Sequence, residues 1–104
     1  MLDVRCESSG DYARVTLRGD VDLSTTEQVA KAVGSVVDEG AAVVDVDLAA
    51  VEFIDSTGLG MLIRLRRTTE ADGVAFRLAN CSERTLEVLR MTRLDALFTL
   101  LSED

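Results

Sequence analysis

Residues 42–60 read AVVDVDLAAVEFIDSTGLG, and this stretch decides the fold. In its first part, 42–48, apolar residues alternate with Asp45 and Asp47, which is typical of a strand that buries one face. A loop through residues 52–55 is expected next. The run 55–60 then leads into an apolar segment that predicts a helix over about 57–72, ended by Gly73.

The flanking sequence predicts further strands and helices in alternation. Two segments of alternating polarity, 2–7 and 13–18, are joined by turn residues and predict an antiparallel hairpin. Ser24 and Glu27 fit a capping box, so a helix is expected over about 25–39. Residues 74–79 predict another strand. A third helix, capped by Asn80 or Ser82, should end near residue 91, before a short apolar tail over 94–101.

Polar residues occupy one face of every predicted strand, which predicts that one face of the sheet is solvated. They are Asp3, Arg5, Arg14, Thr16, Arg18, Asp45, Asp47 and Arg77. The helices should therefore gather mainly on the other face. The prediction is a single α/β domain over 1–104 with a mixed, open sheet of four to five strands: an N-terminal hairpin, then parallel strands.

Composition limits the possible partners. The chain has 104 residues, 47% of them hydrophobic, and a net charge of -8, which disfavours nucleic acid and anionic membrane surfaces. No apolar run is long enough to span a membrane and the start lacks signal-peptide character, so a cytoplasmic protein is expected. Cys6 and Cys81 are expected to be small buried residues in a reducing compartment, without a metal. The chain contains no histidine, so we do not expect an enzyme.

The run Asp55-Ser56-Thr57-Gly58-Leu59-Gly60 has a structural and a functional interpretation. In the structural one, Asp55 or Ser56 caps a helix whose two glycines let it approach neighbouring backbone. In the functional one, the exposed hydroxyl of Ser56 accepts a phosphate, which the N–H groups and dipole of the helix terminus would tolerate. It is not a dinucleotide fingerprint, because Ile63 stands where the third glycine would be.

Gly19-Asp20-Val21-Asp22 ends the second predicted strand. The ends of the second and third strands can lie side by side in an open sheet, which would bring Asp20 or Asp22 close to Asp55 and Ser56. Equally, both acids can be turn residues before a helix, where the dipole favours negative charge.

These two motifs, in an order of hairpin, helix, strand, helix, strand and helix, resemble the STAS family, and within it the bacterial anti-sigma factor antagonists. The resemblance covers nearly the whole chain. It implies phosphorylation of Ser56 by a kinase that is also the anti-sigma factor, using Mg-ATP supplied by that kinase, with reversal by a serine phosphatase. Unphosphorylated antagonist would bind the kinase and release a sigma factor.

The resemblance also assigns a partner-binding surface and shows two departures. The matching positions are Asp20, Asp22, Asp55, Ser56, Thr57, Gly58, Leu59 and Gly60. Thr57 stands where a second serine is frequent and is an alternative acceptor. Arg93 stands where a glycine is frequent after the third helix, at a cost of about 1 kcal/mol if positive φ is needed. No catalytic residue, metal or resident cofactor is implied, and the oligomeric state is left open.

Two alternatives remain at this stage. The domain could be a STAS module that docks onto a transporter or signalling assembly without switching. More remotely, Asp20, Asp22, Asp45, Asp47 and Asp55 could hold magnesium in a phosphohydrolase. A response-regulator receiver is disfavoured because Lys31, the only lysine, falls in the first predicted helix.

Overall fold

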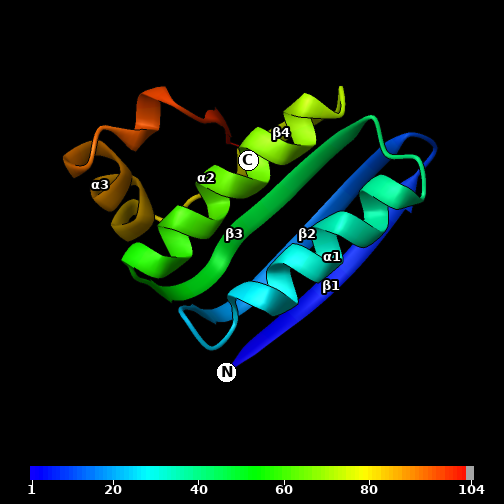
Figure 1. Cartoon of the computed structure of the whole chain (residues 1–104). Helices are drawn as coiled ribbons and strands as arrows, with labels where there is room; N and C mark the ends of the chain where they lie inside the picture. Colours follow the sequence, from blue (N-terminus) through cyan, green and yellow to red (C-terminus); the bar gives the residue numbers. More distant parts are fainter. Residues whose placement is uncertain (103–104) are drawn as a thin grey trace.

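A computed structural model describes residues 1–102, which form a five-stranded mixed sheet with helices on one face (Figure 1). The strands are β1 (Leu2–Ser9), β2 (Tyr12–Val21), β3 (Val43–Ile54), β4 (Ala75–Ala79) and β5 (Thr99–Leu101). The helices are α1 (Thr26–Asp38), α2 (Ser56–Ala71), α3 (Glu83–Met91) and the short 3₁₀ helix η1 (Leu94–Ala96). The predicted fold class is confirmed.

The strands lie in the sheet in chain order. β1 pairs antiparallel with β2, and β2, β3, β4 and β5 pair in parallel. The β2–β3 register places Asp20 opposite Phe53 and Val21 opposite Ile54, so these two strands end together. Helix α2 begins directly after this end of β3.

The apolar faces of α1 and α2 pack against the same side of the sheet, α1 over the hairpin and α2 over β3 and β4 (Figure 1). Their buried stripes repeat at helical spacing, as predicted from the sequence. The fully buried large side chains are Val15, Leu17, Val21, Val29, Val33, Val44, Val46, Leu48, Leu62, Phe76, Leu78 and Leu89. Among the described residues, no helix is long and apolar enough to cross a membrane.

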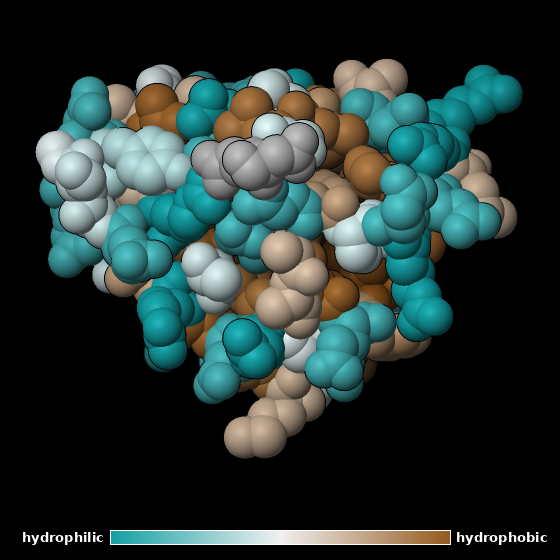
Figure 2. Space-filling model, turned by 180° about the vertical axis from the view of Figure 1, so that it is seen from behind, coloured by the Kyte–Doolittle hydropathy of each residue, from teal (hydrophilic) through white to brown (hydrophobic). Residues whose placement is uncertain are grey.

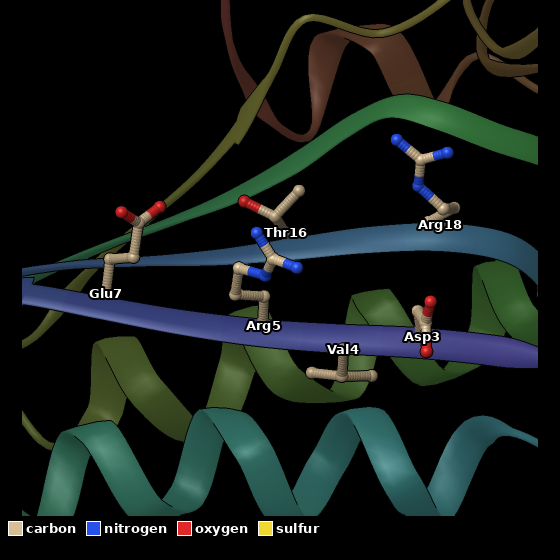
Figure 3. Close-up of a pocket in the computed structure, with 6 residues that line it drawn as sticks. All are labelled: Asp3, Val4, Arg5, Glu7, Thr16 and Arg18. Carbon is tan, nitrogen blue, oxygen red and sulfur yellow. The ribbon is translucent and has the colours of Figure 1, made fainter.

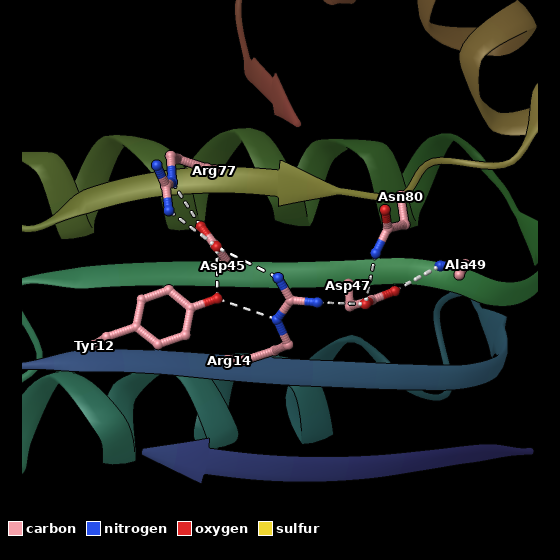
Figure 4. Close-up of polar contacts among 7 residues, drawn as sticks. All are labelled: Tyr12, Arg14, Asp45, Asp47, Ala49, Arg77 and Asn80. Carbon is pink, nitrogen blue, oxygen red and sulfur yellow. Dashed lines mark hydrogen bonds and ion pairs between the residues drawn. The ribbon is translucent and has the colours of Figure 1, made fainter. Parts of the chain in front are cut away.

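The opposite face of the sheet is polar, as predicted, and hydrophilic side chains cover most of it (Figure 2). However, Asp45 and Asp47 are not solvated: they are 1% and 9% exposed. Arg77 from β4 donates to Asp45 at 2.6 and 3.0 Å, and the Tyr12 hydroxyl donates to it at 2.6 Å. Arg14 donates to Asp47 at 2.9 Å (Figure 4). Burial tends to raise the pKa of Asp45, but the bonds from Arg77 and Tyr12 outweigh it and leave that pKa below its usual value.

Three local predictions were wrong. β3 continues through residues 49–54 instead of ending in a loop, because β2 extends to Val21 and keeps pairing with it across two register shifts. The capping box at Ser24 does not form: Thr25 stands at the N-cap position of α1 without a side-chain capping bond, and the Ser24 hydroxyl donates to Asp22 at 2.7 Å. Cys6 is exposed and Cys81 only half-buried; along this face of β1, burial falls from Leu2 through Val4 to Cys6, toward the hairpin turn.

Arg93 adopts a φ of 61°. The cost of about 1 kcal/mol expected for a residue other than glycine at positive φ therefore applies to it. The chain turns there from α3 into η1. The apolar tail then forms strand β5, which pairs with β4 from Arg77 to Ala79.

Candidate functional site

The N-terminus of α2 is capped by Asp55. Its backbone is extended (φ -105°, ψ -176°), and its side chain accepts a hydrogen bond of 2.8 Å from the Gly58 N–H. Ser56 is the first helical residue and is exposed, whereas Thr57 is half-buried. Of the two hydroxyls considered from the sequence, that of Ser56 is therefore the more accessible.

Gly58 lets this helix terminus approach the end of β2. A Cβ atom at Gly58 would lie 2.5 Å from the Val21 carbonyl oxygen and 2.9 Å from Val21 Cγ1. The Asp55 N–H also donates to that carbonyl, at 3.3 Å. Gly60 differs, because a Cβ there would meet only Arg64, at 3.6 Å. The predicted need for close approach is confirmed at Gly58 and is wrong at Gly60.

The loop from β2 to α1 lies beside the start of α2 because Val21 pairs with Ile54. Asp22 Oδ1 accepts hydrogen bonds from the Ser24 N–H at 2.9 Å and the Ser24 hydroxyl at 2.7 Å. These bonds, that of the hydroxyl foremost, hold the pKa of Asp22 below its usual value. The carboxylate of Asp22 therefore shapes the loop and keeps a negative charge there.

Sequence reasoning missed Thr25, which fixes this loop from inside. Its side chain is 4% exposed; its hydroxyl donates to the Asp20 carbonyl at 2.9 Å and accepts from the Asp22 N–H at 3.0 Å. Asp22 is a turn residue, as one interpretation of the sequence had it, whereas Asp20 still belongs to β2 and pairs with Phe53. The pairing of Val21 with Ile54 supports the predicted proximity of both residues to the start of α2. The signal that could have found Thr25 is its place three residues after Asp22, the spacing of a hydroxyl-closed turn.

The residues predicted for partner binding divide by exposure. Ser56 is exposed, and Asp20, Asp22, Asp55, Thr57 and Gly60 are half-buried. Leu59 is 7% exposed and belongs to the core, and Gly58 is buried. These two support the surface from beneath. Two exposed apolar residues beside it, Leu23 and Phe53, were not identified from the sequence.

The five aspartates considered for magnesium do not gather in one place. Asp45 and Asp47 lie on the polar sheet face with Arg77 and Arg14, whereas Asp20, Asp22 and Asp55 lie at the strand ends. Within residues 1–102, no three His, Cys, Asp or Glu side chains are grouped to hold a metal ion. The arrangement does not support the phosphohydrolase alternative.

A shallow hollow of about 480 Å³ lies over the hairpin, away from Ser56. In Figure 3, Asp3, Arg5 and Glu7 from β1 and Arg18 from β2 surround it, while Val4 points to the helices. Its lining carries charges of both signs and none of the predicted site residues.

The STAS domain model matches residues 4–103. The chain belongs to the STAS family. A STAS-domain containing protein of Pseudomonas aeruginosa is 34% identical over 55 residues, which are 53% of this chain, and the match spans about half (54%) of that relative's length.

Solved structures with this fold include an anti-sigma factor antagonist and a sulfate transporter family protein. An anti-sigma factor antagonist from Mycobacterium paratuberculosis superposes with a TM-score of 0.85 at 26% identity, over 97% of this chain and 86% of that one. A sulfate transporter family protein from Wolinella succinogenes gives 0.73 at 22% identity, over 88% and 76%. The STAS family and its likeness to anti-sigma factor antagonists, predicted from the sequence, are thus confirmed. The fold is compatible with both a regulator and a docking module, so the two functions must be distinguished by the residues of the site.

Proposed function

We propose that this STAS protein is an anti-sigma factor antagonist whose affinity for its partner is set by phosphorylation of Ser56. The unphosphorylated form binds an anti-sigma factor that has serine-kinase activity, and a sigma factor is released. The kinase brings Mg-ATP and transfers the γ-phosphoryl group to the Ser56 hydroxyl; a serine phosphatase removes it. The observation that carries the proposal is the exposure of Ser56, the first residue of α2, beside the end of β2 where Asp20 and Asp22 lie.

The helix terminus suits a phosphoserine without refolding. The first N–H groups of α2 face the start of the helix, and the positive end of its dipole favours an anion there. Asp55 already takes the Gly58 N–H at 2.8 Å, and this bond secures the first turn whether or not Ser56 is modified. Thr57 is half-buried, which favours Ser56 as the acceptor.

The same terminus makes the phosphate unfavourable inside an interface. Phosphorylation adds about -1.5 to -2 charges at neutral pH. It does so beside Asp55 and the end of β2, where Asp20 and Asp22 lie, in a chain of net charge -8. A partner surface that accommodates the acidic, unmodified site must desolvate the added charge among like charges. A hundredfold loss of affinity requires only about 2.8 kcal/mol, within the range measured for charges placed in interfaces.

Phosphopeptide mass spectrometry tests the acceptor directly. The protein is incubated with Mg-ATP and each serine-kinase anti-sigma factor of its own genome, as wild type, Ser56→Ala and Thr57→Ala. We expect one phosphate on wild type and on Thr57→Ala, and none on Ser56→Ala. Phosphate retained by Ser56→Ala would assign another acceptor. Its absence from all three proteins would leave a constitutive docking module as the better account.

A further inference from the structure

We infer that the anti-sigma factor is held by an apolar patch beside Ser56, formed by Leu23 and Phe53, and that the partner fills it with an apolar side chain flanked by arginine or lysine. This inference rests on the proposed function and names the chemistry of its partner. Leu23 and Phe53 lie outside both sequence motifs, residues 19–22 and 55–60.

Leu23 and Phe53 are exposed where a soluble domain has no folding reason to expose them. Leu23 is 75% exposed in the loop after β2, and Phe53 is 51% exposed near the end of β3. The β2–β3 register puts Phe53 opposite Asp20, so both apolar side chains belong to the end of the sheet at which α2 begins. Phe53 also precedes Ser56 by only three residues. Exposed aromatic and apolar side chains that cluster at one site mark interaction surfaces.

A groove next to Phe53 has the size for a partner's side chain. Its volume is about 250 Å³, and it is lined by Glu52, Phe53, Ile54, Arg84, Thr85 and Val88 from the end of β3 and the first turns of α3. Small-molecule sites are usually about 300–1,000 Å³ and enclose most of their ligand. This smaller, open groove fits one inserted apolar side chain better than a metabolite.

The charge around the patch selects a basic partner surface. The segments next to the patch contain Asp20, Asp22, Glu52 and Asp55, and the lining of the groove adds one basic residue, Arg84. Such an excess of carboxylates beside exposed apolar residues has the composition of a protein interface, an apolar core within a polar rim. Arginine or lysine on the partner would complement it and speed association. Phosphate on Ser56 would then disturb the contacts of this patch from its edge.

The test is a binding titration of the unphosphorylated protein with the same purified anti-sigma factors, using Leu23→Ala and Phe53→Ala. Met91→Ala is the matched control, because Met91 is 78% exposed but lies at the far end of α3. We expect Phe53→Ala to weaken binding about 30-fold and Leu23→Ala about 10-fold, as hot-spot truncations do. Met91→Ala should stay within about twofold of wild type, and all three should melt like wild type.

Two variants that each remove one negative charge test whether the partner surface is basic. Affinity of the wild type should fall as salt rises from about 50 to 300 mM. Glu52→Gln should weaken this salt dependence, whereas Asp72→Asn, at the other end of α2, should not.

The outcomes separate this inference from the proposal beneath it. If wild type binds but Leu23→Ala and Phe53→Ala bind equally well, or if Met91→Ala is weakened as much, the patch is not the docking site and the switch still stands. If unphosphorylated wild type binds none of the anti-sigma factors, both the patch and the antagonist function are overturned.

Discussion

Replacing Gly58 by alanine should destabilise the protein although it removes a glycine from a helix. The added Cβ would lie 2.5 Å from the Val21 carbonyl oxygen, 2.9 Å from Val21 Cγ1 and 3.0 Å from Ile54 Cγ1. The nearest of these is backbone and cannot rotate away, so α2 or β2 must move by several tenths of an ångström. Overpacking of this kind costs about 1–3 kcal/mol, and the severe contact with backbone places this site at the upper end. The helix-propensity gain of about 1 kcal/mol offsets part of it, and we expect a net loss of about 2 kcal/mol.

Gly60→Ala is the matched control, on the same helix two residues later. Its Cβ would meet only Arg64, at 3.6 Å, so the propensity gain of up to about 1 kcal/mol should appear without a clash. Urea unfolding followed by circular dichroism at 222 nm measures both variants, and a loss of 2 kcal/mol should lower the midpoint by roughly 0.7–2 M. A Gly58→Ala protein as stable as wild type, or a Gly60→Ala protein destabilised to the same extent, would refute the packing argument.

Three further predictions concern the sheet and the turns. Asp45→Asn should lower the free energy of unfolding by about 3 kcal/mol, because it leaves Arg77 without its buried carboxylate. Since the pKa of Asp45 is lowered in the native state, the wild type should also lose stability as the pH falls below about 4. Urea midpoints measured between pH 2 and 6 should therefore fall less for the variant than for the wild type. Arg93→Gly should raise the free energy of unfolding by about 0.5–1 kcal/mol, since φ is 61° there; a lower urea midpoint would contradict this. At pH 8 a thiol reagent should label exposed Cys6 well before Cys81, whose pKa is raised to about 11 by burial, and equal labelling rates would refute that ordering.

The fold was predictable because each element carries its own local pattern. Residues 13–18 alternate with period two, and Val29, Val33 and Val36 repeat with helical period, so strand and helix could be distinguished without tertiary information. The polar residues on every strand even predicted which sheet face the helices leave open. The hairpin followed by helical crossovers predicted that the later strands would be parallel.

The errors fall where tertiary partners override local pattern. Residues 49–54 lack clear alternation, and they form a strand because β2 is long enough to pair with them. Asp45 looks like a surface residue by itself, but arginine side chains from the two neighbouring strands cover it. Ser24 and Glu27 have the right spacing for a capping box, yet the carboxylate of Asp22 takes the hydroxyl first.

The candidate site was only partly visible in the sequence. Its motif residues, Asp55 to Gly58 above all, stood out because glycine and a capping acid have recognisable roles at a helix start. Thr25, Leu23 and Phe53 did not, since a loop hydroxyl or an apolar residue near a strand end has many ordinary explanations. Only the pairing of Val21 with Ile54 brings the segments that carry these residues to the same end of the sheet.

The central claim is best tested by measuring how phosphate on Ser56 changes the affinity for the anti-sigma factor. Protein phosphorylated on Ser56 and unmodified protein are titrated against the same kinase in the same buffer, with Ser56→Ala as the control that cannot be modified. The account predicts tight binding by the unmodified protein and by Ser56→Ala, and binding about a hundredfold weaker once Ser56 carries phosphate. Equal affinities of the phosphorylated and unmodified proteins would contradict it.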